Sequence, residues 1–250
     1  MSAAGRVRAE FTAATRSFLR RRTAVFFTFF FPVIIILIFG ALVQTQPTGG
    51  GLFTEPAGYY IPGYLAVVVL FTPLSRVGSE VARHREGNRF EKLATTPLSR
   101  PEWLLAQTLV NVVIIGLAGL LILGLVVLVT GAQFALSPLV VPFVALGVAT
   151  FCGVGALLGS YAGSQDGVIA ASNAIALPLL FLSQTFVPLA LLPEWFRPAV
   201  WLSPLTYFAR GVRAATFDPA SADPLVNLGI LAVLAVILFG LGALALPQTD

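Results

Sequence analysis

The chain has 250 residues, of which 57% are hydrophobic and only 10% are charged. Soluble domains carry about 25% charged residues, and a soluble globule of this length could not keep so much apolar surface away from water. The composition therefore excludes an ordinary soluble domain and predicts an integral membrane protein. The net charge of +4 does not indicate a nucleic-acid partner, because the cations gather beside apolar stretches rather than over a soluble face.

The chain begins with a basic segment, residues 1–22, that has a helical pattern. Val7, Phe11, Ala14 and Phe18 recur at spacings of four and three residues, so they share one helix face. Such a basic amphipathic helix typically lies in the membrane interface beside anionic lipid. The alternative is a solvated leader that only sets the topology.

Six uncharged apolar stretches follow, and each is a candidate membrane span. A bilayer core about 30 Å thick requires roughly 20 apolar residues in a helix. Continuous rather than alternating hydrophobicity favours helices over a barrel. The first stretch is too long for a signal-peptide core of about 7–15 residues, so we interpret it as a retained helix. The predicted spans are 23–43, 59–75, 103–130, 138–162, 168–187 and 225–246.

The positions of the cations predict the orientation. Residues 1–22 and 76–102 together hold 12 of the 15 Lys and Arg residues. Cytoplasmic loops carry such an excess, so both segments are expected in the cytoplasm, and six spans return the C-terminus there too. Arg197, Arg210 and Arg213 are exceptions, since this topology places them outside together with three carboxylates.

The segment 76–102 carries six cations and four carboxylates around Phe90 and Leu93. Charges of both signs with an embedded aromatic residue suit a helix that docks on another protein. Gly87 is expected to end one helical piece, and Pro97 forbids a continuous helix through this region. A solvated connector is equally compatible with these residues.

The segment 188–224 is broken by prolines and contains aromatic residues that favour the membrane–water interface. This combination predicts one or two short helices that dip into the outer leaflet and pack against the spans. An ordinary interfacial loop is the alternative. The residues concerned are Pro188, Pro193, Pro198, Pro204, Trp195, Trp201 and Tyr207.

Several kinds of catalytic site are excluded by the residues that the chain has. Lys92 is the only lysine and follows no glycine-rich loop, so no P-loop for ATP is present. His84 is the only histidine and Gly-X-Ser-X-Gly does not occur, which argues against a Ser-His hydrolase. Cys152 and His84 cannot form a Cys/His metal cluster. We therefore expect no catalytic residues, no metal site and no cofactor bound by this chain.

The polar residues inside the predicted spans are neutral. Ion-coupled secondary transporters usually keep carboxylates, histidines or lysines within the membrane, so this alternative function is disfavoured but kept. A neutral, apolar lining favours amphipathic drugs, lipids or lipid-linked glycans over small ions as substrates. The neutral polar residues, expected to be buried between helices, are Gln107, Asn111, Asn173, Gln184 and Asn227.

Two motifs, in the expected order among the spans, resemble those of the ATP-binding-cassette (ABC) type-2 permeases. The first is Arg85-Glu86-Gly87, Phe90-Glu91-Lys92-Leu93 and Thr96-Pro97-Leu98-Ser99. The second is Pro188, Leu192-Pro193-Glu194-Trp195 and Ser203-Pro204-Leu205-Thr206-Tyr207. The similarity covers essentially the whole chain.

The resemblance implies an all-α integral membrane protein that is the membrane-spanning subunit of an exporter. Such permeases pair with a second permease copy, as a homo- or heterodimer, and bind a separate ABC ATPase subunit that holds the ATP and Mg. The implied location is the plasma membrane of a prokaryote, with multiple passes and both termini in the cytoplasm. Asn88, where Thr is common, and the short acidic C-terminal tail depart from the family pattern.

The resemblance also implies roles for particular segments. Residues 76–102 would contain a coupling helix that docks in a groove of the ATPase, and residues 1–22 would be the connecting helix on the membrane surface. Residues 188–207 would be re-entrant helices that close the path on the exterior. The implied coupling residues are Arg85, Glu86, Gly87, Phe90, Glu91 and Leu93, and the implied exterior gate residues are Pro188, Pro193, Trp195, Pro204 and Tyr207.

Overall fold

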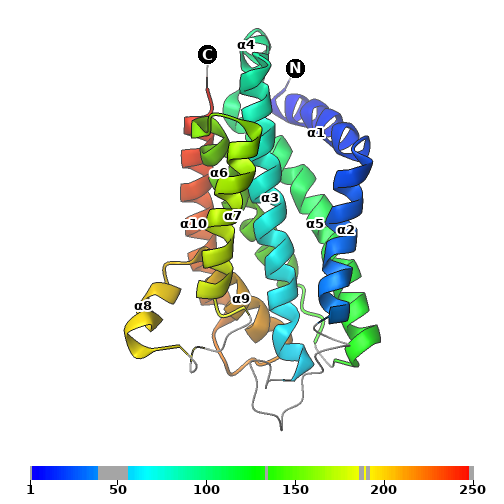
Figure 1. Cartoon of the computed structure of the whole chain (residues 1–250), viewed down its shortest axis with the longest axis vertical. Coiled ribbons are helices and arrows are strands. Elements are labelled where there is room, and N and C mark those ends of the chain that lie inside the picture. The colour runs from blue at the N-terminus through cyan, green and yellow to red at the C-terminus, as the bar shows by residue number, and fades with distance from the viewer. Residues whose placement is uncertain (1, 39–55, 133–134, 186–188, 190–191, 248–250) are drawn as a thin grey trace.

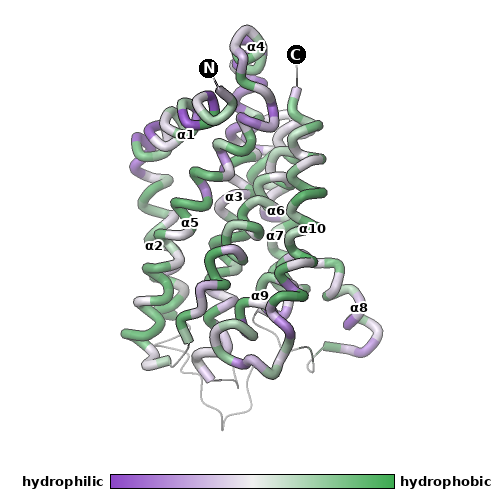
Figure 2. The backbone as a smooth tube through the Cα atoms, turned by 180° about the vertical axis from the view of Figure 1, so that it is seen from behind, coloured by the Kyte–Doolittle hydropathy of each residue, from purple (hydrophilic) through white to green (hydrophobic). Residues whose placement is uncertain are grey.

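The structure is a computed structural model, and it describes residues 2–38, 56–132, 135–185, 189 and 192–247. Within these residues the fold is all helical. Hydrophobic residues cover the middle of the long helices, and hydrophilic residues gather toward the two ends of the bundle (Figure 2). The helices are α1 (Ala3–Leu19), α2 (Arg22–Ile36), η2 (Ala57–Tyr60), α3 (Ile61–Glu86), α4 (Arg89–Ala94), α5 (Arg100–Thr130), α6 (Val140–Tyr161), α7 (Gln165–Leu182), η4 (Glu194–Phe196), α8 (Arg197–Val200), α9 (Pro204–Thr216) and α10 (Pro224–Ala245).

Five helices of the described residues are long and apolar enough to cross a membrane: α3 together with η2, α5, α6, α7 and α10. They coincide with five of the six predicted spans. The predicted span 23–43 corresponds to α2, but residues 39–43 lie outside the described residues. The predicted span 168–187 is longer at its end than α7, which ends at Leu182, and its residues 186–187 also lie outside the described residues. The described part of α2 is a shorter apolar helix.

The second long helix extends beyond its predicted end. The predicted span 59–75 stops where the charges begin, whereas α3 continues to Glu86. Between Pro73 and Gly87 the only glycine or proline is Gly78, which packs inside the bundle and does not end the helix. Arg and Glu have high helix propensity, so the charged residues extend the helix out of the apolar layer. Gly87 is the C-cap of α3, as predicted.

Small residues bring the central helices into close contact. A Cβ atom added at Gly159 of α6 would lie 2.3 Å from the carbonyl oxygen of Gly78 in α3. A Cβ atom at Gly153 of α6 would lie 2.3 Å from the carbonyl oxygen of Leu238 in α10. Backbones approach this closely only where side chains are minimal, as is common between membrane helices. These contacts fix α6 between α3 and α10.

The two ends of the bundle carry different elements. Both chain termini, α1 and α4 lie at one end, whereas α8 and α9 lie at the other (Figure 1). The predicted topology also places both termini and the segment 76–102 together, opposite the segment 188–224. α1 follows the predicted amphipathic pattern, with Ala14 and Phe18 buried and Arg8, Arg16 and Arg20 exposed.

Candidate functional site

A short charged helix, α4, protrudes from the end of the bundle that carries both termini (Figure 1). The chain turns into α4 at Asn88, which has a left-handed backbone with φ of 49°. Asn tolerates this conformation better than most residues because its short side chain is small and polar. Gly87 ends α3 with φ of −100°, so the left-handed turn is made by Asn88 and not by the glycine.

The base of α4 is held by an aromatic cluster. The ring centroids of Phe90 and Trp103 lie 5.6 Å apart, and each lies 5.4 Å from the centroid of His84. Phe90 is 4% exposed and Trp103 is 2% exposed. The cluster joins α4 to the end of α3 and the start of α5. Phe90 therefore anchors α4 from inside and does not present its ring to solvent.

Two of the predicted coupling residues contact the turn between α6 and α7. Arg85 donates from Nη1 to the carbonyl oxygen of Ala162, at 2.9 Å, beyond the last turn of α6. Glu86 accepts at Oε1 from the backbone N–H of Gln165, at 3.0 Å, in the first turn of α7. A cation at a helix C-terminus and an anion at a helix N-terminus both complement the helix dipole. The end of α3 is thereby bound to α6 and to α7.

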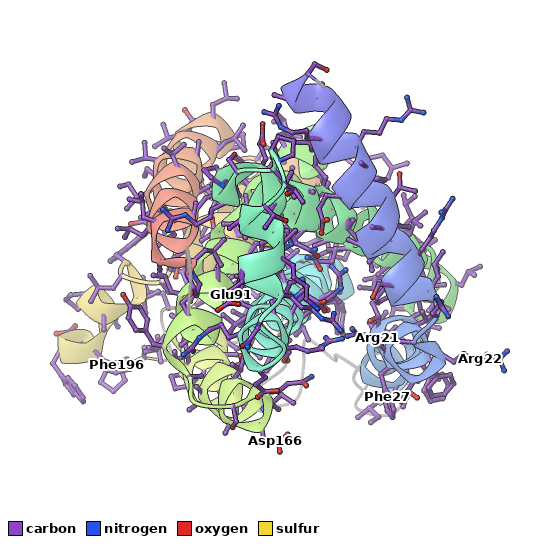
Figure 3. All side chains as sticks on the ribbon, turned by 90° about the horizontal axis from the view of Figure 1, so that it is seen from above. Arg21, Arg22, Phe27, Glu91, Asp166 and Phe196 are labelled. Atoms are coloured by element: carbon purple, nitrogen blue, oxygen red, sulfur yellow. The ribbon has the colours of Figure 1, made fainter. Side chains whose placement is uncertain are left out.

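The outer face of α4 is charged and exposed. Arg89, Glu91 and Lys92 are exposed, whereas Leu93 is half-buried against the core; Figure 3 views this end from above and labels Glu91. A cavity of about 510 Å³ lies on one side of α4, lined by residues of α4, the start of α5 and Pro247. A second, of about 350 Å³, lies at the turn between α6 and α7 and includes Glu86. An exposed charged helix with a cavity on either side offers a surface that a partner protein can contact.

α1 is fastened to α5 by polar contacts. Arg6 donates from Nε to Glu102 Oε2 at 3.0 Å and from Nη2 to the other carboxylate oxygen. This hydrogen bond raises the pKa of the Arg6 guanidinium. Glu102 also completes the capping box of α5 with Ser99, so the same carboxylate starts α5 and holds α1.

A second polar pair lies one turn further along α1. Gln107 donates from Nε2 to Glu10 Oε1 at 3.1 Å. Burial raises the pKa of the Glu10 carboxyl, and the hydrogen bond from Gln107 opposes that shift. Below this pair, Ala14 and Phe18 pack against Val110 and Ile114 of α5. α1 is thus attached along most of its length.

The predicted exterior gate residues do not form one cluster. Pro193 and Trp195 are exposed on the arm formed by η4 and α8, which extends away from the bundle (Figure 1). Pro204 and Tyr207 belong to α9, which packs against α3, α6 and α10. Tyr207 donates its hydroxyl to the carbonyl oxygen of Trp201 at 2.9 Å. Pro188 lies outside the described residues.

Arg213 of α9 is buried, whereas the predicted topology placed it outside the membrane in a loop. Arg213 is 4% exposed. It donates from Nη2 to the carbonyl oxygen of Gln184 at 2.6 Å, and its guanidinium lies 3.8 Å from the centroid of the Tyr59 ring. These contacts join α9 to η2 and to the residues after α7. The signal in the sequence is the apolar spacing of Leu205, Phe208 and Val212, which predicts a buried helix.

Of the neutral polar residues in the spans, Asn173 is not buried as expected. Gln107, Asn111, Gln184 and Asn227 are buried, whereas Asn173 is exposed on α7. Its side chain lines a lateral cavity. In the part of the chain that the structure describes, no three His, Cys, Asp or Glu residues form a group that could hold a metal ion.

The chain matches a known protein family. The family model described as "ABC-2 type transporter" matches residues 6–217. No curated protein matches the chain. The matched range begins within α1 and ends immediately after α9, so it includes α4, the aromatic cluster, α8 and α9.

Proposed function

Because the chain belongs to the ABC-2 type transporter family, we propose that it is one permease subunit of an exporter that a separate ATPase subunit drives. The family membership makes it a permease component without an ATP-binding site. The working complex would contain a second permease copy, identical or different, and the ATPase subunits. α2 would be the sixth membrane helix.

The observation that carries this proposal is α4. It is a short, exposed, charged helix at the end of the bundle that carries both termini (Figure 1). Helix faces with charges of both signs orient a protein partner. We assign Glu91 and its exposed neighbours Arg89 and Lys92 to the contact with the ATPase. This end would then face the cytoplasm, where the ATP is.

The remaining predicted coupling residues would transmit movement rather than touch the ATPase. Phe90 locks α4 to α3 and α5, and Arg85 and Glu86 bind the end of α3 to α6 and α7. When ATP closes the ATPase subunits, a push on α4 would therefore move four helices together. The permease converts the difference in partner binding between two states into a change of access.

We infer an amphipathic substrate, such as a lipid, a drug-like molecule or a lipid-linked glycan. The five long helices are apolar along most of their length (Figure 2), and such walls favour apolar or amphipathic cargo over small ions. The location we propose is the plasma membrane of a prokaryote. The exterior helix α9, tied to the ends of α3 and α7 through Arg213, would close the path on the outer side.

A charge-reversal pair tests the docking surface. The tagged chain is purified from its native membrane in mild detergent, and the ATPase that accompanies it is quantified by mass spectrometry and by vanadate-sensitive ATP hydrolysis. Glu91→Arg should reduce the recovered ATPase by about tenfold or more, since like charges facing each other across an interface cost several kcal/mol.

The matched control is Glu194→Arg at the opposite end of the bundle. Glu194 is also exposed, with 89% of its side chain accessible, so the change in charge is the same. It should leave ATPase recovery unchanged. Undiminished recovery with Glu91→Arg, or an equal loss with Glu194→Arg, contradicts the assignment of α4.

A further inference from the structure

The α1–α2 corner consists of Arg20 and Arg21. Arg20 is the C-cap of α1, and Arg21 is the N-cap of α2 with φ of −93° and ψ of 79°. The axes of α1 and α2 point in different directions (Figure 1), so the chain turns at these two residues. A contact that holds the side chain of Arg21 therefore acts at the place where the two helices meet.

Glu80 of α3 holds the α1–α2 corner. Arg21 donates from Nη2 to Glu80 Oε2 at 3.3 Å, across 59 positions of the sequence. The side chain of Glu80 is 15% exposed and that of Arg21 is 37% exposed, so water and salt screen this ion pair only in part. In Figure 3, Arg21 lies between the α1–α2 corner and α3, whereas Arg22 points away from the bundle. Of these adjacent arginines, Arg21 is the one that contacts α3.

The last turn of α1 also contacts α3. The guanidinium carbon of Arg76, one helical turn before Glu80 on α3, lies 5.3 Å from the centroid of the Phe18 ring. This distance is within the range of a cation–π interaction. The α1–α2 corner is thus attached to α3 at two points that are one turn apart.

Glu80 is also connected to the base of α4. Its Oε2 accepts from Arg83 Nη2 at 2.7 Å, and His84 Nδ1 lies 2.8 Å from its carbonyl oxygen and 3.6 Å from its Oε1. The His84 ring belongs to the aromatic cluster that contains Phe90 of α4 and Trp103 of α5. The turn of α3 from Glu80 to His84 therefore contacts both α4 and the α1–α2 corner.

Apolar contacts attach the start of α2 in a different way. Ala24 and Val25 pack against the cluster that contains Val110 and Ile114 of α5. Such contacts are non-directional, so they hold α2 against its neighbours without fixing its position along them. A hydrogen-bonded ion pair has a defined geometry. Removal of the Glu80 charge should therefore leave the α1–α2 corner attached but let it move independently of α3.

We propose that Glu80 is a positioning residue that makes the α1–α2 corner follow α3 when the ATPase acts on α4. This inference rests on the docking of the ATPase on α4 proposed above. Under that proposal α4 moves together with α3, α5, α6 and α7, and the pair of Glu80 and Arg21 adds α2 to this group. Coupling between two separate parts of a protein requires an element that both parts bias. The end of α3 is this element, because it contacts α4 and the α1–α2 corner within one turn.

Hydrogen–deuterium exchange of the purified complex measures this movement. The full chain is purified with its ATPase from the native membrane, and exchange is compared without nucleotide and with ATP and vanadate. In the wild type, the amides of α4 and those of residues 18–25 should exchange at different rates in the two conditions. Glu80→Gln keeps the size of the side chain but removes its charge. It should preserve the response of α4 and reduce that of residues 18–25 by about twofold to fivefold, the range expected for a partly exposed ion pair.

A second variant covers the case in which Glu80→Gln does not fold. Arg21→Gln removes the other partner of the ion pair and should have the same effect. The double variant should add nothing further, since both substitutions remove one interaction. Two controls should keep the wild-type response. Arg22→Gln removes a charge at the adjacent, outward-facing residue, and Asp166→Asn neutralises an exposed carboxylate at the same end of the bundle.

The outcomes separate this inference from the proposed function. If α4 of the wild type does not respond to nucleotide, the docking of the ATPase on α4 is wrong and so is the role of Glu80. If α4 responds but residues 18–25 do not, or respond equally in the wild type and in both glutamine variants, only the role of Glu80 is wrong. A purely structural contact would raise exchange at the α1–α2 corner equally in both conditions. An unchanged difference between the conditions would therefore also overturn the inference.

Discussion

Charged side chains near α4 are used in two different ways. Arg85 and Glu86 satisfy backbone groups at the ends of α6 and α7, whereas Glu91 faces solvent. The first two therefore stabilise the fold, and the third is available to a partner. Single substitutions should separate stability from docking.

Replacing Arg85 with methionine tests the stabilising role. Arg85→Met keeps the length of the side chain but removes the donor to Ala162, and it should lower stability by about 1 kcal/mol, since the pair is partly exposed. Thermal unfolding followed by tryptophan fluorescence should show a lower Tm. Glu91→Arg should leave Tm unchanged. A normal Tm for Arg85→Met would mean that the contact with the turn between α6 and α7 is not stabilising.

The Glu10 carboxyl gives a pH-dependent prediction. Burial raises its pKa in the folded chain, so the folded state binds this proton more tightly than the unfolded state does, and ionisation at neutral pH destabilises the attachment of α1. Glu10→Gln keeps the shape and the hydrogen bond with Gln107 but removes the charge. It should raise Tm by a few degrees at pH 7.5.

The advantage of Glu10→Gln should fade as the pH falls through the pKa of the folded carboxyl, because protonated Glu10 is then equally neutral. Tm measured at several pH values in one buffer series checks this. An advantage that persists unchanged at acidic pH would show that the substitution acts through packing and not through the charge.

At the scale of elements, the helices that have a regular apolar pattern could be predicted from the sequence. The spacing of Phe11, Ala14 and Phe18 predicted α1, and apolar stretches predicted six spans, five of which correspond to long apolar helices of the described residues. The end of α3 could not be predicted, because the apolar stretch and the helix end at different residues. The first charged residues show where the apolar stretch ends, whereas Gly87 shows where the helix ends.

The geometry of the candidate site depends on contacts between residues far apart in the sequence. Phe90 was predicted to be at a partner contact, but its ring lies against His84 and Trp103. Arg85 reaches Ala162, 77 positions away. Local pattern identifies which residues are unusual, but only the packing of α3, α5 and α6 decides whether they face inward.

The contact between α6 and α10 gives a prediction about helix packing. A Cβ atom at Gly153 would lie 2.3 Å from the carbonyl oxygen of Leu238, whereas a Cβ atom at Gly240 of α10 meets nothing within 4 Å. Gly153→Ala should therefore force the helices apart and cost about 1–3 kcal/mol. Gly240→Ala should be neutral or slightly stabilising, because alanine favours a helix.

Size-exclusion chromatography and thermal unfolding of the two alanine variants check this difference. Both substitutions add one methyl group to a membrane helix, so a general effect of hydrophobicity would appear equally in both. Equal Tm values for Gly153→Ala and Gly240→Ala would contradict the close approach of α6 and α10.

For the whole molecule, the positions of the cations agree with the arrangement of the helices. The two basic segments lie at the end with both termini, and α8 and α9 lie at the other end (Figure 1). Arg213 is a cation at the end where the orientation rule expects few cations. It is buried and donates hydrogen bonds to the carbonyl oxygens of Tyr59 and Gln184. The rule concerns cations in loops, so a cation that holds helices together does not count against the topology.

The orientation can be tested with two alanine positions at opposite ends. Ala94 of α4 and Ala220 after α9 are both exposed, and the native Cys152 is fully buried, so Cys152→Ala provides a background without thiols. A membrane-impermeant maleimide applied to intact cells should label Ala220→Cys and leave Ala94→Cys unlabelled until the cells are permeabilised. If Ala94→Cys reacts first, α4 faces the exterior, where it could not meet a cytoplasmic ATPase, and the exporter mechanism fails.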